Sequence, residues 1–153
     1  MSAELVFMMG RFEARFPTDR QYAKNHMWAQ RCPEDGRVRF GFTGYAVRLL
    51  QDVYFLEWSV DADTPLREKQ AIGAIESSKA ESELYSPQDG RLTEFNPGLL
   101  ADPSTINVDM YGAGWLFAME TPGSGLLTPE EYLVHLEASW KIAERTIKGQ
   151  LND

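Results

Sequence analysis

The primary amine of Lys79 is the reactive group with the most distinctive surroundings in the sequence. Lys79 ends the polar tetrad Glu76-Ser77-Ser78-Lys79, which lies between the small apolar run Ala71–Ile75 and the strand-like run Ser82–Ser86. Two such runs joined by a few polar residues predict a β-hairpin, and this hairpin would present Lys79 at its tip. A solvated turn lysine is the simpler interpretation, and composition alone favours it.

Other side chains that commonly carry chemistry are scattered along the chain. The two histidines, His26 and His135, show no metal-ligand spacing, so each is interpreted as a partly buried imidazole. Cys32 lies beside Pro33 in a polar turn and is interpreted as an incidental thiol. The run Gly123-Ser124-Gly125 lacks the strand–turn–helix setting of a nucleophile elbow. We therefore predict no catalytic residue and no metal site.

Length and charge narrow the class of protein. The chain has 153 residues, which suits one domain, and 43% of them are hydrophobic, as in a globular protein. Its 23 acidic and 15 basic residues give a formal net charge of −8, which argues against nucleic acid and membranes as partners. The single cysteine excludes an internal disulfide. No signal-peptide pattern or bilayer-spanning apolar stretch is present, so we expect a cytoplasmic protein.

The elements that would position Lys79 are mostly short strands. Polar and apolar residues alternate over Arg37–Thr43, and Asp52–Trp58 is rich in β-branched and aromatic residues, so both predict strands. Thr43 is a candidate N-cap for a short helix that reaches Leu50. Gly114–Met119 predicts a last buried strand. The fold class is therefore mostly β.

The two ends of the chain have a different character. Residues 1–20 carry too many aromatic and aliphatic side chains for a free tail, so we predict an N-terminal appendage that packs on a body over residues 21–120. Residues 121–153 predict a linker and a C-terminal amphipathic helix. Thr128 is its N-cap, Pro129 takes the first helical position, and Glu131 completes a capping box.

The hairpin around Lys79 resembles the lipoylation hairpin of the glycine cleavage system H protein family. The tetrad is followed by Ala80, by Leu84-Tyr85-Ser86-Pro87 and by Gly90, in the family's order. The resemblance covers about residues 20–120. Further motifs match on the expected elements: His26-Met27-Trp28, Gly41-Phe42-Thr43-Gly44-Tyr45-Ala46, Val53-Tyr54-Phe55-Leu56-Glu57, and the run from Asn107 to Leu116.

This resemblance implies a fold and a role. The fold would be a barrel-sandwich hybrid of two small antiparallel sheets with a helical C-terminus, and residues 21–120 would be the lipoyl-carrier domain. Lys79 would carry lipoic acid in amide linkage, with Glu76 and Glu83 helping a lipoate ligase to recognise the hairpin. Such a carrier is not itself an enzyme. Partner enzymes perform the chemistry, and a dihydrolipoamide dehydrogenase-like enzyme would reoxidise the arm.

Departures from the family pattern bear on what the arm carries. Met27 stands where the family has a glutamate that holds the cationic aminomethyl cargo, and Asn25 precedes the histidine. Glu83 could supply the second acid. We therefore take Asn25, Met27 and Glu83 as candidates for a groove that receives the arm. Methionine suits a sulfur-bearing arm, although it could equally be a simple space-filling side chain.

These departures favour one branch of the family. The run from Gly41 to Asp52 resembles lipoate-binding proteins of cytoplasmic sulfur oxidation, which work beside a heterodisulfide-reductase-like complex. We therefore expect a carrier of sulfur intermediates. The alternatives are a glycine cleavage H protein, which shuttles the aminomethyl group among glycine cleavage enzymes, and a non-lipoylated H-like binding module.

Overall fold

The computed structural model describes the backbone of residues 3–152 and the side chains of residues 3–145. Eleven strands are present in this part of the chain: β1 (Glu4–Met9), β2 (Phe12–Pro17), β3 (Gln21–Tyr22), β4 (Met27–Arg31), β5 (Val38–Phe42), β6 (Val53–Trp58), β7 (Pro65–Leu66), β8 (Ala71–Ser77), β9 (Glu81–Tyr85), β10 (Gly90–Phe95) and β11 (Phe117–Glu120). The described helices are α1 (Gly44–Leu50), α2 (Pro97–Ala101), α3 (Thr105–Val108) and α4 (Pro129–Asn152).

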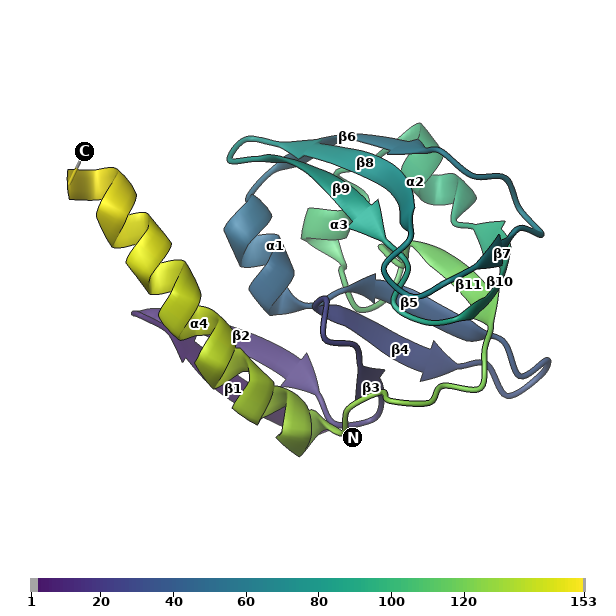
Figure 1. Ribbon diagram of the computed structural model, residues 1–153, viewed down its shortest axis with the longest axis horizontal. Helices are drawn as coiled ribbons and strands as arrows, with labels where there is room; N and C mark the ends of the chain where they lie inside the picture. The colour runs from purple at the N-terminus through teal and green to yellow at the C-terminus, as the bar shows by residue number, and fades with distance from the viewer. Residues whose placement is uncertain (1–2, 153) are drawn as a thin grey trace.

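The body of the molecule contains two antiparallel sheets, which enclose the main core (Figure 1). One sheet has six strands in the order β3-β4-β5-β11-β10-β7, and the other has three in the order β6-β8-β9. Alternate residues of each strand point inward. Fully buried examples are Phe40, Ile72, Leu92 and Phe117. The prediction of a mostly β fold with a C-terminal helix is confirmed, and none of the three sheets in the described residues closes into a barrel.

The structure differs from the sequence expectation in three places. A third sheet, the two-stranded β1–β2 ribbon, accompanies the two that were expected. Two short helices, α2 and α3, lie between β10 and β11, where no helix was predicted. The last strand begins at Phe117 instead of Gly114. Hydrogen-bonded backbone turns form over residues 109–114, and the chain joins the sheet only after them.

Helix α1 connects the two sheets and lies below the tip of the β8–β9 hairpin in Figure 1. The side chain of Thr43 accepts a hydrogen bond from Ala46 N at 3.4 Å, so Thr43 caps the helix as expected. The helix ends at Gln51, which adopts a positive φ of 63°. A positive φ is the backbone region that favours glycine, so the conformation of Gln51 is unusual for a residue with a side chain.

The β1–β2 ribbon and α4 pack against each other beside the body. Phe16 of β2 and Tyr132 and Leu136 of α4 are fully or almost fully buried in a second core cluster. The predicted capping box is present, since Thr128 N donates to the Glu131 carboxylate at 2.9 Å and Glu131 N donates to Thr128 Oγ1 at 3.1 Å. Helix α4 then runs along the ribbon and away from the body (Figure 1). Within the described residues, no helix has the length and apolar character that a bilayer crossing requires.

Candidate functional site

Lys79 lies in the tight turn between β8 and β9, where its side chain is exposed. The turn is held by Ser77, whose side chain is buried. Ser77 Oγ accepts hydrogen bonds from Lys79 N at 3.3 Å and Ala80 N at 3.2 Å, and it donates to Ala80 O at 3.2 Å. Among the described residues, Lys79 forms no ion pair. The amine therefore projects into solvent from a well-ordered bend.

A second set of contacts ties this turn to the body. Ser78 N donates to Asp52 O at 2.9 Å, and Asp52 N donates to Ser78 Oγ at 3.2 Å. Val53, which follows Asp52, is also held in place, because its backbone N donates a hydrogen bond to Asn107 Oδ1 at 2.9 Å. The hairpin tip is thus anchored to the end of α1 and to α3.

Carboxylates flank the exposed amine on both strands. Glu76 and Glu81 are directly opposite each other in the β8–β9 register, and Glu83 follows two residues later. Like charges in that arrangement repel each other and do not stabilise the hairpin. Glu76 and Glu83 were expected near Lys79, whereas Glu81 was missed. The position of Glu81 could have been predicted from the sequence, since a tight turn at 78–80 places residues 76 and 81 opposite each other.

The three groove candidates lie on one cavity of about 260 Å³. Asn25 and Met27 line one side, and Glu83 lines the side formed by the β8–β9 hairpin. The remaining walls are mainly apolar and come from α1 and the two sheets; they include Phe42, Ala46, Leu49, Leu50 and Ile75. The hairpin that carries Lys79 at its tip is therefore also a wall of this cavity.

Each candidate has a distinct environment in the cavity. Met27 is 1% exposed and pairs with Phe42 in the β4–β5 register, so it contributes an apolar surface. The Glu83 carboxylate accepts a hydrogen bond from the Tyr85 hydroxyl at 3.0 Å, and this bond raises the pKa of Tyr85. Asn25 Nδ2 donates to Tyr85 O at 3.1 Å. Tyr85 thus links the one acidic and the one amide side chain of the cavity.

His26 also lines the cavity, which the sequence interpretation did not anticipate. Its Nδ1 atom lies 3.0 Å from the hydroxyl of Tyr132, and its ring stacks on His135 with centroids 5.3 Å apart. Burial, with a smaller contribution from the charge of His135, lowers the pKa of His26 to about 4. Both partners belong to α4, more than a hundred residues away, so spacing in the sequence could not reveal them.

Within the described part of the chain, no three His, Cys, Asp or Glu side chains are grouped suitably for a metal ion. His135 Nε2 instead lies 2.8 Å from the backbone oxygen of Lys24. This contact holds α4 against the loop that precedes β4.

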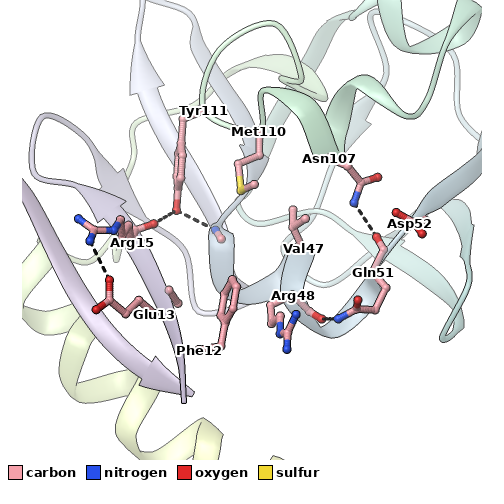
Figure 2. A pocket seen from close by; sticks show the side chains of 12 residues that line it. Phe12, Glu13, Arg15, Val47, Arg48, Gln51, Asp52, Asn107, Met110 and Tyr111 are labelled. Carbon is pink, nitrogen blue, oxygen red and sulfur yellow. Dashed lines mark hydrogen bonds and ion pairs between the residues drawn. The ribbon is translucent and has the colours of Figure 1, made fainter. Parts of the chain in front are cut away.

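A second cavity, of about 330 Å³, lies on the other side of α1 (Figure 2). It is bounded by β2, α1 and the segment 107–111, and none of the predicted site residues lines it. The Tyr111 hydroxyl accepts from Gly44 N and donates to Arg15 O, both at 2.7 Å. Asn107 Nδ2 donates to Gln51 O at 2.6 Å. These contacts connect the ribbon, α1 and α3.

Comparison with known proteins connects this geometry to a family. The family model described as "Glycine cleavage H-protein" matches residues 20–145, which leaves the β1–β2 ribbon outside the match. The chain is 38% identical over 128 residues to a glycine cleavage system H protein of Xanthomonas euvesicatoria, a match that covers 81% of this chain and 96% of that protein. It is 40% identical over 119 residues to a probable glycine cleavage system H protein of Natronomonas pharaonis, covering 76% and 92% respectively.

A solved structure leads to the same family. The crystal structure of a glycine cleavage system H protein from Mycobacterium marinum superposes with a TM-score of 0.68 and 37% identity, and the match covers 76% of this chain and 95% of that chain. The family model's match, over residues 20–145, spans the two-sheet body that holds Lys79 and the cavity. The chain belongs to the glycine cleavage H-protein family.

Proposed function

We propose that this protein is a lipoyl carrier and that Lys79 is the residue to which lipoic acid is attached. The observation that carries the proposal is the exposed amine of Lys79 on a turn held by Ser77 and anchored to Asp52, in a chain of the H-protein family. A dithiolane at the end of a long acyl-lysine arm would supply reversible thiol–disulfide chemistry and two sulfur atoms for carrying a group.

The residues around Lys79 fit such an arm. Acylation removes the positive charge of the lysine, which leaves a largely apolar chain with a polar amide. A mainly apolar cavity lies beside the hairpin and has room for part of that chain. The polar residues that line it are Asn25, His26, Ser82, Glu83 and Tyr85. We propose this cavity as the resting place of the arm and Glu76 and Glu83 as contacts for a lipoate ligase.

The cargo we propose is the aminomethyl group of glycine cleavage. This differs from the sulfur-oxidation role expected from the sequence, and the names of the similar proteins support the change, since each is a glycine cleavage system H protein or a probable one. Glu83 would attract the ammonium end of this cargo. Glycine cleavage enzymes and a dihydrolipoamide dehydrogenase-like enzyme are the partners this function implies, with catalysis performed by them, in the cytoplasm.

Sulfur transport with a heterodisulfide-reductase-like complex is the second candidate, and Met27 is the observation that favours it. Met27 is almost fully buried in the cavity wall, where the family pattern has a glutamate. Removing one carboxylate partner from a partly buried cation weakens binding by about 2–5 kcal/mol, so the aminomethyl cargo would be held less firmly. A thioether is instead compatible with neutral sulfur groups.

Mass spectrometry of the intact protein tests lipoylation. The protein is expressed with lipoate and a lipoate ligase from a source that contains a similar hairpin. We expect one lipoyl group per chain, its loss in Lys79→Ala, and its retention in Lys24→Ala, which removes another exposed lysine, adjacent in sequence to Asn25 of the cavity. An unmodified wild-type protein, or a modified Lys79→Ala variant, would refute the proposal.

An exchange assay separates the two cargoes. The lipoylated protein is supplied to glycine decarboxylase, and the exchange of labelled CO₂ into the carboxyl group of glycine is measured. Robust exchange that disappears in Lys79→Ala supports the glycine cleavage role. Lipoylated protein that supports no exchange would favour the sulfur carrier.

A further inference from the structure

A line of buried hydrogen-bonding groups runs from α4 to the cavity. His26 Nδ1 lies 3.0 Å from the Tyr132 hydroxyl, which lies 2.9 Å from Thr43 Oγ1. Tyr132 is 0% exposed and Thr43 is 1% exposed. Solvent therefore cannot satisfy these two hydroxyl groups, and their protons must be shared among the three side chains.

The hydroxyl protons determine which nitrogen of His26 is protonated. Thr43 Oγ1 already accepts from Ala46 N, and its own proton has one acceptor in the described part of the chain, the Tyr132 oxygen. The Tyr132 proton then points to His26 Nδ1, so the ring proton of the neutral imidazole resides on Nε2. The reverse order would leave the Thr43 proton unpaired in a buried site, which is disfavoured roughly tenfold to a hundredfold.

The ring is held firmly in this orientation. It packs on Tyr45 with centroids 4.6 Å apart and on His135 with centroids 5.3 Å apart. In the described structure Nε2 has no hydrogen-bond partner, and His26 lines the cavity next to Met27 and across from Glu83. The lowered pKa of His26 agrees with a neutral ring that carries one proton at pH 7.

Tyr132 is itself fixed by aromatic contacts. Its ring stacks on Tyr22 at a centroid distance of 4.6 Å and an interplanar angle of 5°, and it meets the edge of Phe16 at 5.3 Å. Phe16 belongs to the β1–β2 ribbon, which lies outside the residues matched by the family model. The ribbon and α4 together therefore determine where the Tyr132 hydroxyl lies.

We propose that His26 offers its Nε2–H group as a hydrogen-bond donor to the sulfur-bearing end of the lipoyl arm in the cavity, and that Tyr132 is the positioning residue that selects this tautomer. The inference rests on the proposed lipoyl function. The attachment end of the arm is fixed at the hairpin tip, outside the cavity-lining residues, so the end that reaches His26 is the distal one. Sulfur accepts hydrogen bonds weakly when neutral and strongly as a thiolate.

The tautomer is tested on the unmodified protein by NMR of ¹⁵N-labelled histidine. We expect the His26 signals of a neutral ring protonated at Nε2 in the wild type. Tyr132→Phe keeps the ring but removes the hydroxyl, so the population protonated at Nδ1 should rise several-fold. Tyr45→Phe is the matched control, because it keeps the ring that packs on His26 and should leave the tautomer unchanged. A His26 ring protonated at Nδ1 in the wild type, or unaffected by Tyr132→Phe, would overturn the role of Tyr132.

The contact with the arm is tested on lipoylated protein whose mass has been verified. Lipoylation and subsequent reduction should shift the His26 Nε2 signal more than either His135 nitrogen signal, and Tyr132→Phe should reduce that shift at least twofold. An unchanged His26 Nε2 signal in verified lipoylated protein would overturn the donor role while leaving the lipoyl function intact. If Lys79 did not accept lipoate, the proposed lipoyl function would be rejected, and the contact between His26 and the arm would be rejected too. The tautomer result on the unmodified protein would not depend on that outcome.

Discussion

Ser78 and Asp52 are joined by two reciprocal hydrogen bonds, Ser78 N to Asp52 O at 2.9 Å and Asp52 N to Ser78 Oγ at 3.2 Å. These contacts fasten the turn that presents Lys79 to the segment that follows α1. A lipoate ligase that acts as proposed would meet the amine on a bend whose backbone is already ordered, which reduces the entropy lost on binding.

The side chain of Ser77 should be more important for this turn than that of Ser78. Ser77→Ala removes three hydrogen bonds at a buried position, and the Ala80 and Lys79 amides lose their acceptor. We expect the free energy of unfolding to fall by about 1–3 kcal/mol and the rate of lipoylation to fall several-fold. Urea denaturation and time-resolved mass spectrometry measure both. Ser78→Ala is the control and should have a smaller effect, so equal effects of the two changes would contradict this assignment.

Met27→Glu tests how the cavity holds a cationic cargo. The new carboxylate would face the cavity together with Glu83 and restore the acid of the family pattern. We expect protein loaded with the aminomethyl group to lose it about thirtyfold more slowly, since a paired charge is worth roughly 2 kcal/mol or more in such a site. Mass spectrometry of the loaded protein over time gives the rate. Met27→Gln is the uncharged control, and loss at the wild-type rate in Met27→Glu would show that the cargo lies elsewhere.

His26 should make stability depend on pH in a defined window. Burial lowers the pKa of His26 to about 4, below the unfolded value of 6.5, so the unfolded chain binds the proton more readily. The stabilisation from the neutral ring is complete above pH 6.5 and is lost as the pH falls towards 4. The loss should reach about 2–3 kcal/mol.

Urea unfolding at several pH values, compared between the wild type and His26→Gln, isolates this contribution, because the other titrating groups are common to both proteins. The wild type should lose more stability than the variant between pH 6.5 and 4. Parallel curves for the two proteins over this range would be inconsistent with a depressed His26 pKa.

Phe16→Ala tests whether the β1–β2 ribbon supports the rest of the molecule. Phe16 is 1% exposed and contacts the rings of Tyr22 and Tyr132. Its truncation should lower the free energy of unfolding by about 3–5 kcal/mol. Val6→Ala is the control on the same ribbon, since Val6 is 40% exposed and should change stability by less than about 0.5 kcal/mol. A small effect of Phe16→Ala would mean that the ribbon packs only loosely on the body.

Short sequence motifs correctly predicted the parts of the fold that are determined by residues close together in the chain. The β8–β9 hairpin, the cap of α1 by Thr43 and the capping box of α4 all follow from residues within a few positions of each other. No helix was predicted at α2, because asparagine and proline are residue types that commonly interrupt secondary structure. The same residue types also begin helices, and here the Asn96 side chain accepts from Gly98 N at 3.0 Å.

Sequence patterns could not predict the contacts between segments that are far apart in the chain. The grouping of Asn25, Met27 and Glu83 came from resemblance to a family, and the structure brings them to one cavity. The contact between His26 and Tyr132 depends on how α4 packs against the body, and neither residue type nor spacing indicates it. The domain boundaries at residues 20 and 120 stay predictions.

The modification state of Lys79 is the central claim, and peptide mapping by tandem mass spectrometry tests it most directly. The protein is expressed with lipoate and a suitable ligase, digested, and every lysine-containing peptide is examined. The account predicts a lipoyl group on Lys79 and on no other lysine. An unmodified Lys79, or a lipoyl group on a different residue, would contradict it.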